Sequence, residues 1–161
     1  EDADALVERG LRIHAVDIDA VDVVPRELAR LAEALGLDVA VPDIPDPLPD
    51  RGLTAFVPLW RRPWMTVSPD TYTASMLRWL GVDLVLTDGV GRYPTVELDD
   101  IIRARPDVVL APSEPYPFTE RHRAELQQVA PTVFVDGEDL VWWGTRTPVA
   151  LERLAAQLAD A

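Results

Sequence analysis

The sequence predicts an α/β protein with three layers, in which a mostly parallel sheet carries helices on both faces. From residue 52 onwards, short apolar runs of strand length alternate with segments of helical periodicity. The runs themselves, such as residues 108–111, are continuously apolar, which is typical of strands buried on both faces of a parallel sheet. A chain of 161 residues is also long enough to form one such core.

The first forty residues predict separate elements that cannot form a core of their own. Residues 2–9 have the pattern of a short helix, and residues 11–18 alternate apolar and polar side chains as a strand does. Leucines and alanine then recur at helical spacing from position 28 to 35, and Gly36 is placed to end that helix. Because one strand and one helix are too few for independent stability, this part needs a partner upstream or must pack onto the rest of the chain.

The clearest boundary is the proline-rich segment 41–51, which has prolines at positions 42, 45, 47 and 49. Neither a helix nor a central strand tolerates that density of proline, so we expect an extended linker. The chain therefore divides into residues 1–40, the linker 41–51 and an α/β domain over 52–161.

Beyond the linker, Ser68-Pro69 and Thr147-Pro148 each place a hydroxyl residue before a proline, a pattern typical of a helix start. The expected elements, in order, are a strand over 54–60, a short strand over 65–68, a helix from 69 to 80, a strand over 82–87, a helix around 98–102, a strand over 108–111, a helix from 119 to 126, a strand over 132–135 and a final helix from 148.

Composition excludes several classes of protein. The formal net charge of −13 disfavours binding to nucleic acid, whose phosphates would repel the chain. Cysteine is absent, which excludes disulfides and thiolate metal sites. No apolar run approaches the ~20 residues of a membrane span. The chain opens with Glu rather than Met, so we expect an upstream segment to be missing, and the lack of a signal peptide leaves the compartment open.

Aromatic residues gather in the loops of the α/β domain. Tyr93-Pro94 lies before an acidic helix start at 97–100, and Pro-Tyr-Pro-Phe at 115–118 follows the buried run 106–112. Loops carried on a strand–helix scaffold are where binding residues concentrate. Any single ring could instead pack over a strand end, and the sequence leaves both interpretations open.

The two aromatic loops are preceded by Arg61-Arg62-Pro63-Trp64-Met65 and followed by the segment 136–148. The order of these segments resembles the C-terminal lobe of the helical-backbone metal receptors, which are the substrate-binding proteins of ABC importers for cobalamin and ferric siderophores. The resemblance covers roughly residues 52–158 and is more specific for the family than for the ligand. It implies that residues 1–40 are the end of a first lobe and the start of a connecting helix. It also implies that a ligand is clamped between two lobes without covalent chemistry.

The resemblance and the loop positions together indicate a set of ligand-binding candidates. Rigid aromatic walls suit the broad apolar face of a corrinoid, and arginines suit carboxylate or catecholate oxygens. The arginines could equally form salt bridges, and Glu114 could either accept hydrogen bonds from ligand amides or cap its own loop. One of the two adjacent tryptophans should face the core, because neighbours in a strand-like stretch point to opposite sides. The candidates are Trp60, Arg62, Trp64, Tyr93, Glu114, Tyr116, Trp142, Trp143 and Arg146.

Asp99 is a candidate for docking rather than ligand binding. The resemblance places it at an acidic position that, in the family, meets arginines of the membrane permease. A carboxylate in the first turn of a helix also stabilises the helix dipole, so the docking role rests on the resemblance.

We expect no enzymatic activity. The chain has no Gly-x-Ser-x-Gly elbow and no phosphate loop, and its two histidines, His14 and His122, have no metal-ligand neighbours in sequence. No cofactor and no protein-bound metal are expected, since cobalt or iron would belong to the transported ligand.

The favoured function is the binding component of an ABC importer for a cobalamin-like corrinoid or metal chelate. It would act as an extracytoplasmic monomer that delivers the ligand to a membrane permease. The alternatives are a ferric siderophore or haem receptor, or an intracellular binding or sensing module of the same fold. A hydrolase or transferase on a similar sheet is less favoured.

Overall fold

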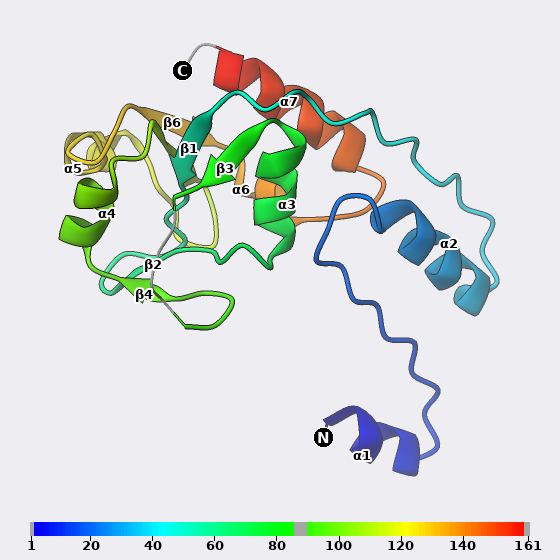
Figure 1. The fold of residues 1–161 in the computed structure, drawn as a ribbon. Helices are drawn as coiled ribbons and strands as arrows, with labels where there is room; N and C mark the ends of the chain where they lie inside the picture. Colours follow the sequence, from blue (N-terminus) through cyan, green and yellow to red (C-terminus); the bar gives the residue numbers. More distant parts are fainter. Residues whose placement is uncertain (1, 86–89, 160–161) are drawn as a thin grey trace.

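The centre of the structure is a four-stranded sheet in the order β3-β1-β5-β6, in which every pair of neighbours is parallel. Figure 1 labels three of its strands, β1, β3 and β6. The structure is a computed structural model that describes residues 2–85 and 90–159. A second, antiparallel pair joins β2 to β4. The strands are β1 (Leu53–Phe56), β2 (Trp64–Met65), β3 (Val82–Leu84), β4 (Thr95–Val96), β5 (Val108–Pro112) and β6 (Thr132–Val135).

Helices cover both faces of this sheet, so the predicted three-layer α/β fold is confirmed. Successive strand residues point to opposite faces. Ala55 and Leu110 accordingly join a core with α3, α6 and α7, whereas Phe56 and Val109 join a second core with α4 and α5. The helices are α3 (Tyr72–Trp79), α4 (Leu98–Ala104), the 3₁₀ turn η1 (Glu120–His122), α5 (Arg123–Leu126), α6 (Gly137–Val141) and α7 (Thr147–Ala159).

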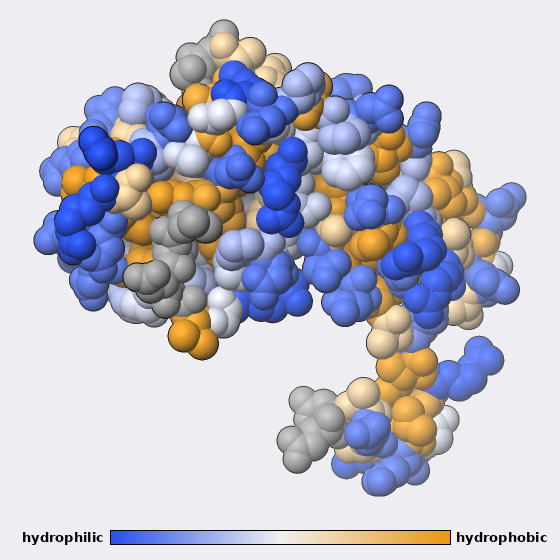
Figure 2. Space-filling model, viewed as in Figure 1, coloured by the Kyte–Doolittle hydropathy of each residue, from blue (hydrophilic) through white to orange (hydrophobic). Residues whose placement is uncertain are grey.

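The N-terminal part leads away from the sheet. Helix α1 (Asp2–Glu8) is followed by an extended stretch, and Figure 1 shows both lying apart from the α/β layers. The strand expected over 11–18 is wrong: these residues have extended backbone but no ladder partner among the described residues. Apolar side chains on α1 and this stretch are exposed, as the orange surface at the lower right of Figure 2 shows. This segment therefore adds little to either core.

Helix α2 (Val24–Leu35) begins against the α/β layers. Val21 and Val24 are fully buried in the core beneath α3, and the Val21 amide donates a hydrogen bond to Ser75 Oγ (3.0 Å). The helix ends as expected at Gly36, whose left-handed φ of 64° suits glycine. The beginning of α2 is thus fixed to the α/β domain.

The proline-rich segment 41–51 contains neither helix nor strand, as its prolines led us to expect. It is held along α3 and α7 by polar contacts. Trp79 Nε1 donates to the Pro45 carbonyl (2.8 Å), and Arg51 Nη2 donates to the Leu158 carbonyl (2.9 Å). The segment is therefore extended but attached to the domain that follows it.

Several element boundaries differ from the sequence prediction. Helix α3 is capped by Thr71, whose side chain accepts a hydrogen bond from Ala74 N (3.3 Å), and not by Ser68, whose hydroxyl donates to Asp70 (3.1 Å). The strand expected over 54–60 shortens to β1, and the strand expected over 65–68 overlaps β2 only at Met65. The described part of the strand expected over 82–87 ends at Leu84, and residues 86–89 lie outside the described residues.

Candidate functional site

A pocket of about 590 Å³ opens beyond the carboxyl ends of the parallel strands. Open α/β sheets bind their ligands at this edge. Its walls come from the segments that follow β1, β5 and β6, together with β2 and the loop before β4. The described residues that line it are Leu59, Trp60, Met65, Tyr93, Glu114, Pro115, Val141 and Trp142.

The structure brings four of the sequence-predicted candidates to this pocket, namely Trp60, Tyr93, Glu114 and Trp142. The three aromatic rings are 44%, 54% and 53% exposed, respectively. Rings this exposed gain little from the cores. They present apolar area to anything that enters the pocket.

A smaller hollow of about 210 Å³ adjoins the pocket and shares Leu59, Tyr93 and Val141 with it. Arg92 and Trp143 line the smaller hollow. Trp143 is partly buried against the core beneath α3, whereas Trp142 is exposed. One tryptophan of the pair thus faces the core, as predicted. Trp142 has extended backbone, as the strand-like interpretation predicted, but it belongs to no strand and directly follows the end of α6.

Trp64 and Tyr116 do not line the pocket. Trp64 stacks on Phe118 at 6.1 Å between ring centroids, and both candidates pack against the core on the α4 and α5 side. Tyr116 lies 4.8 Å from Phe118 and meets Trp60 edge-on at 5.6 Å. Tyr116 therefore packs against the ring of Trp60 and does not itself line the pocket.

His122 belongs to the same aromatic cluster. Its Nδ1 accepts a hydrogen bond from the Thr119 amide (3.0 Å) in a capping box, and its Nε2 lies 3.3 Å from the Tyr116 hydroxyl. Burial, together with the positive charges of Arg121 and Arg61, lowers the pKa of His122. The ring is therefore neutral at neutral pH. Thr119 begins the helical segment as predicted, although the segment is a 3₁₀ turn followed by α5.

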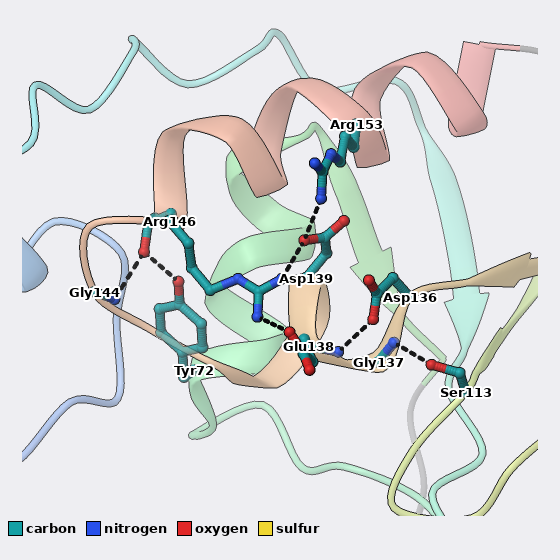
Figure 3. A network of polar contacts seen from close by, with 10 residues as sticks. Tyr72, Ser113, Asp136, Gly137, Glu138, Asp139, Gly144, Arg146 and Arg153 are labelled. Atoms are coloured by element: carbon teal, nitrogen blue, oxygen red, sulfur yellow. Dashed lines mark hydrogen bonds and ion pairs between the residues drawn. The ribbon is translucent and has the colours of Figure 1, made fainter.

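Arg146 is held by acidic side chains (Figure 3) and does not line the pocket. Its guanidinium pairs with Glu138 and, at 2.9 Å, with Asp139. The hydrogen bond that Arg146 donates to the Glu138 carboxylate is the main cause that raises the pKa of Arg146. The salt-bridge alternative therefore describes Arg146, which also lies 5.9 Å from the centroid of the Trp142 ring.

The ion pairs around Arg146 tie α6 to α7. Asp139 is almost fully buried and lies 3.5 Å from Arg153 as well as near Arg146. At the start of α6, the Asp136 side chain accepts a hydrogen bond from Glu138 N (3.0 Å) and caps the helix. This network fixes the position of Trp142 at the end of α6. The network could not be predicted from the sequence, because no spacing in the chain shows which arginine meets which carboxylate.

The remaining candidates lie outside the pocket. Arg62 is exposed and does not line the pocket. Asp99 is exposed in the first turn of α4, beside Asp100, which pairs with Arg103. The pocket also has apolar lining that sequence analysis did not single out, namely Leu59, Met65, Pro115 and Val141. Pro115 lies in the loop after a predicted strand, and that position is a signal that could have found it. Leu59 and Met65 fell within predicted strands, and α6, which carries Val141, was not predicted.

Within the described ranges, no group of three or more histidine or carboxylate side chains is placed to hold a metal ion. No helix in the described part of the chain is long and apolar enough to cross a membrane.

No family model and no curated protein sequence matches this chain. Among solved structures, the periplasmic vitamin B12-binding protein BtuF of Vibrio cholerae matches with a TM-score of 0.67 at 14% identity, covering 99% of this chain and 69% of that one. An ABC transporter substrate-binding protein from Listeria monocytogenes matches with a TM-score of 0.71 at 14% identity, covering 99% of this chain and 72% of that one. The periplasmic haem-binding protein BhuT, in complex with two haems, matches with a TM-score of 0.71 at 20% identity, covering 99% of this chain and 70% of that one.

These comparisons establish the fold. The chain has the fold of the two-lobe substrate-binding proteins of ABC importers and spans about 70% of the length of these structures. The resemblance predicted from the sequence is confirmed at this level.

Proposed function

We propose that the protein is the ligand-binding component of an ABC importer and that the pocket beside Trp60, Tyr93 and Trp142 forms one wall of its ligand site. The observation that carries this proposal is the convergence of three exposed rings at the carboxyl edge of the sheet. A pocket of about 590 Å³ falls within the ~300–1,000 Å³ range of small-molecule sites.

The ligand we favour is a cobalamin-like corrinoid. Its flat macrocycle would stack against the exposed rings and bury apolar area on both partners. Solved structures of the same fold include proteins for vitamin B12 and for haem, which supports a flat, metal-containing ligand. Haem and ferric siderophores are the competing ligands. The metal would arrive within the ligand, and the protein would bind it without chemical transformation.

Delivery requires a partner in the membrane. Asp99 is an exposed carboxylate at the start of α4 and is suited to pair with an arginine of the permease. The receptor would act as a monomer on the outer side of the membrane.

Tryptophan fluorescence tests the proposal directly. Cyanocobalamin, a ferric siderophore and haem are titrated separately, with correction for inner-filter absorption. A saturable quench by at least one of them is expected, because Trp60 and Trp142 lie at the pocket. Trp142→Phe should reduce the quench, while Trp79→Phe, which changes a ring beside the linker, should leave it unchanged. No saturable response to any of the three ligands contradicts the proposed function.

A further inference from the structure

Glu114 is a charged side chain in an otherwise apolar part of the pocket wall. Of the described residues that line the pocket, it alone carries a formal charge. It is partly buried, and its carboxylate makes no hydrogen bond or ion pair with any residue between 2 and 85 or between 90 and 159. A partly buried carboxylate without a partner is unfavourable, and a ligand that donates hydrogen bonds would relieve that cost.

The backbone around Glu114 is fixed. Ser113 N donates to the Val135 carbonyl (3.0 Å), and Ser113 Oγ accepts from the Gly137 amide (3.0 Å). Gly137 lies so close that a Cβ there would be 2.7 Å from the Glu114 N and O atoms. Glu114 is therefore presented by a rigid junction between β5 and α6, which is the way a binding group is pre-organised.

Two of the arginines near the pocket, Arg61 and Arg146, are neutralised by carboxylates. Arg146 pairs with two carboxylates, and Arg61 forms a salt bridge to Glu125 (2.8 Å). An anionic ligand would therefore meet the free carboxylate of Glu114 without a free guanidinium beside it. Like charges across an interface are costly, so this arrangement selects against carboxylates at that end of the ligand.

Arg92 provides a positive charge in the adjoining hollow, which shares Tyr93 with the pocket. It lines the adjoining hollow, and its guanidinium has no hydrogen bond or ion pair within the described parts of the chain. The two connected hollows thus offer a hydrogen-bond acceptor at Glu114 and a donor at Arg92, with aromatic rings between them. A primary amide can satisfy both, because it donates through N–H and accepts through its carbonyl.

We infer that the site selects an uncharged, amide-rimmed ligand over a carboxylate-rimmed one of the same shape, with Glu114 as the residue that sets this preference. This inference rests on the proposed function and deepens it. Ligand amide N–H groups donate to Glu114, and amide carbonyls accept from Arg92. A ligand rimmed by carboxylates places a negative charge against Glu114.

Two corrinoids with the same macrocycle make the test. Dicyanocobinamide carries amides around the ring, whereas dicyano-cobyrinic acid carries carboxylates at the corresponding positions. The wild-type protein should bind the amide form about tenfold or more tightly than the acid form, the effect of one unfavourable charge contact. Glu114→Gln should narrow this ratio mainly by improving binding of the acid form. Arg92→Gln should weaken binding of the amide form, and Glu152→Gln on α7 makes the same charge change outside the pocket and should leave the ratio unchanged.

The outcomes separate the two proposals. Equal or tighter binding of the acid form, an unchanged ratio in Glu114→Gln, or binding of haem without binding of either corrinoid overturns the inference and leaves a binding protein with another preference. Failure of both corrinoids, haem and a ferric siderophore to bind overturns the proposed function and the inference with it.

Discussion

Replacing Gly137 by alanine should destabilise the protein, although alanine is the better helix former. An alanine Cβ would clash with Glu114 Cγ and would lie 2.7 Å from the Glu114 N and O atoms. The backbone of Glu114 must therefore retreat by roughly 0.7 Å before the contact becomes an ordinary one at about 3.4 Å. A backbone shift of this kind in a packed region costs about 1–3 kcal/mol.

Two effects oppose each other at this position. Gly137 begins α6, where alanine gains up to about 1 kcal/mol of helix propensity over glycine. The measured loss will therefore understate the cost of the contact. Urea unfolding gives the difference in the free energy of unfolding, and thermal unfolding should show a fall of about 2–4 °C per kcal/mol for a chain of this length.

The double variant Glu114→Ala/Gly137→Ala identifies which contact is responsible. Removing the Glu114 side chain relieves the contact with Cγ but not the contacts with the backbone N and O atoms. Gly137→Ala should therefore lower the free energy of unfolding almost as much in the Glu114→Ala background as it does in the wild type. No loss in that background would show that only a flexible side chain is displaced. A gain in stability in Gly137→Ala alone would refute the packing argument, because helix propensity offsets at most about 1 kcal/mol of the contact cost.

Four further predictions concern single residues. Tyr93→Ala should weaken binding of the favoured ligand yet change the free energy of unfolding by less than about 1 kcal/mol, since the ring is 54% exposed; fluorescence titration and urea unfolding check both. Trp142→Ala should lower affinity with little loss of stability, whereas Trp143→Ala should lower stability because its ring packs against the core; the reverse pattern would exchange their roles. The lowered pKa of His122 means that the unfolded chain binds its proton more readily, so stability should fall as the pH drops below about 6.5, and His122→Gln should lessen this fall relative to wild type. Asp99→Arg should abolish ligand uptake by cells that carry the permease while binding in solution stays intact; unchanged uptake would limit Asp99 to the helix dipole.

The strands of the sheet could be predicted from sequence because burial on both faces demands continuous apolar runs. Residues 108–111 and 132–135 became β5 and β6 with boundaries shifted by at most one residue. The alternation over 11–18 failed as evidence because a strand exists only when another strand pairs with it, and none is available there among the described residues. The start of α3 was misplaced because two candidate caps, Ser68 and Thr71, lie close together and their hydrogen bonds decide between them.

The candidate site was predictable where chain position alone decides. The same edge of the sheet brings together residues that are far apart in sequence, because each follows an element that ends there. These residues are Trp60, Glu114 and Trp142. Trp64 and Tyr116 carry the same kind of ring in similar loops, yet they pack with Phe118. That difference depends on tertiary contacts, which a linear pattern does not record.

The electrostatic character of the pocket was the part least accessible to sequence. Arginines 61, 92 and 146 all stand beside aromatic loop residues and look equivalent in the chain. In the fold, two of them are neutralised by carboxylates from other elements, and only Arg92 keeps an unpaired guanidinium within the described residues. The ion pairs therefore determine which charges a ligand meets. A change in the paired acid Glu125 should accordingly alter ligand preference without touching the pocket wall, because it would release the positive charge of Arg61. Improved binding of dicyano-cobyrinic acid by Glu125→Gln would support this reasoning, and an unchanged ratio of the two corrinoids would show that Arg61 lies too far from the ligand to act on it.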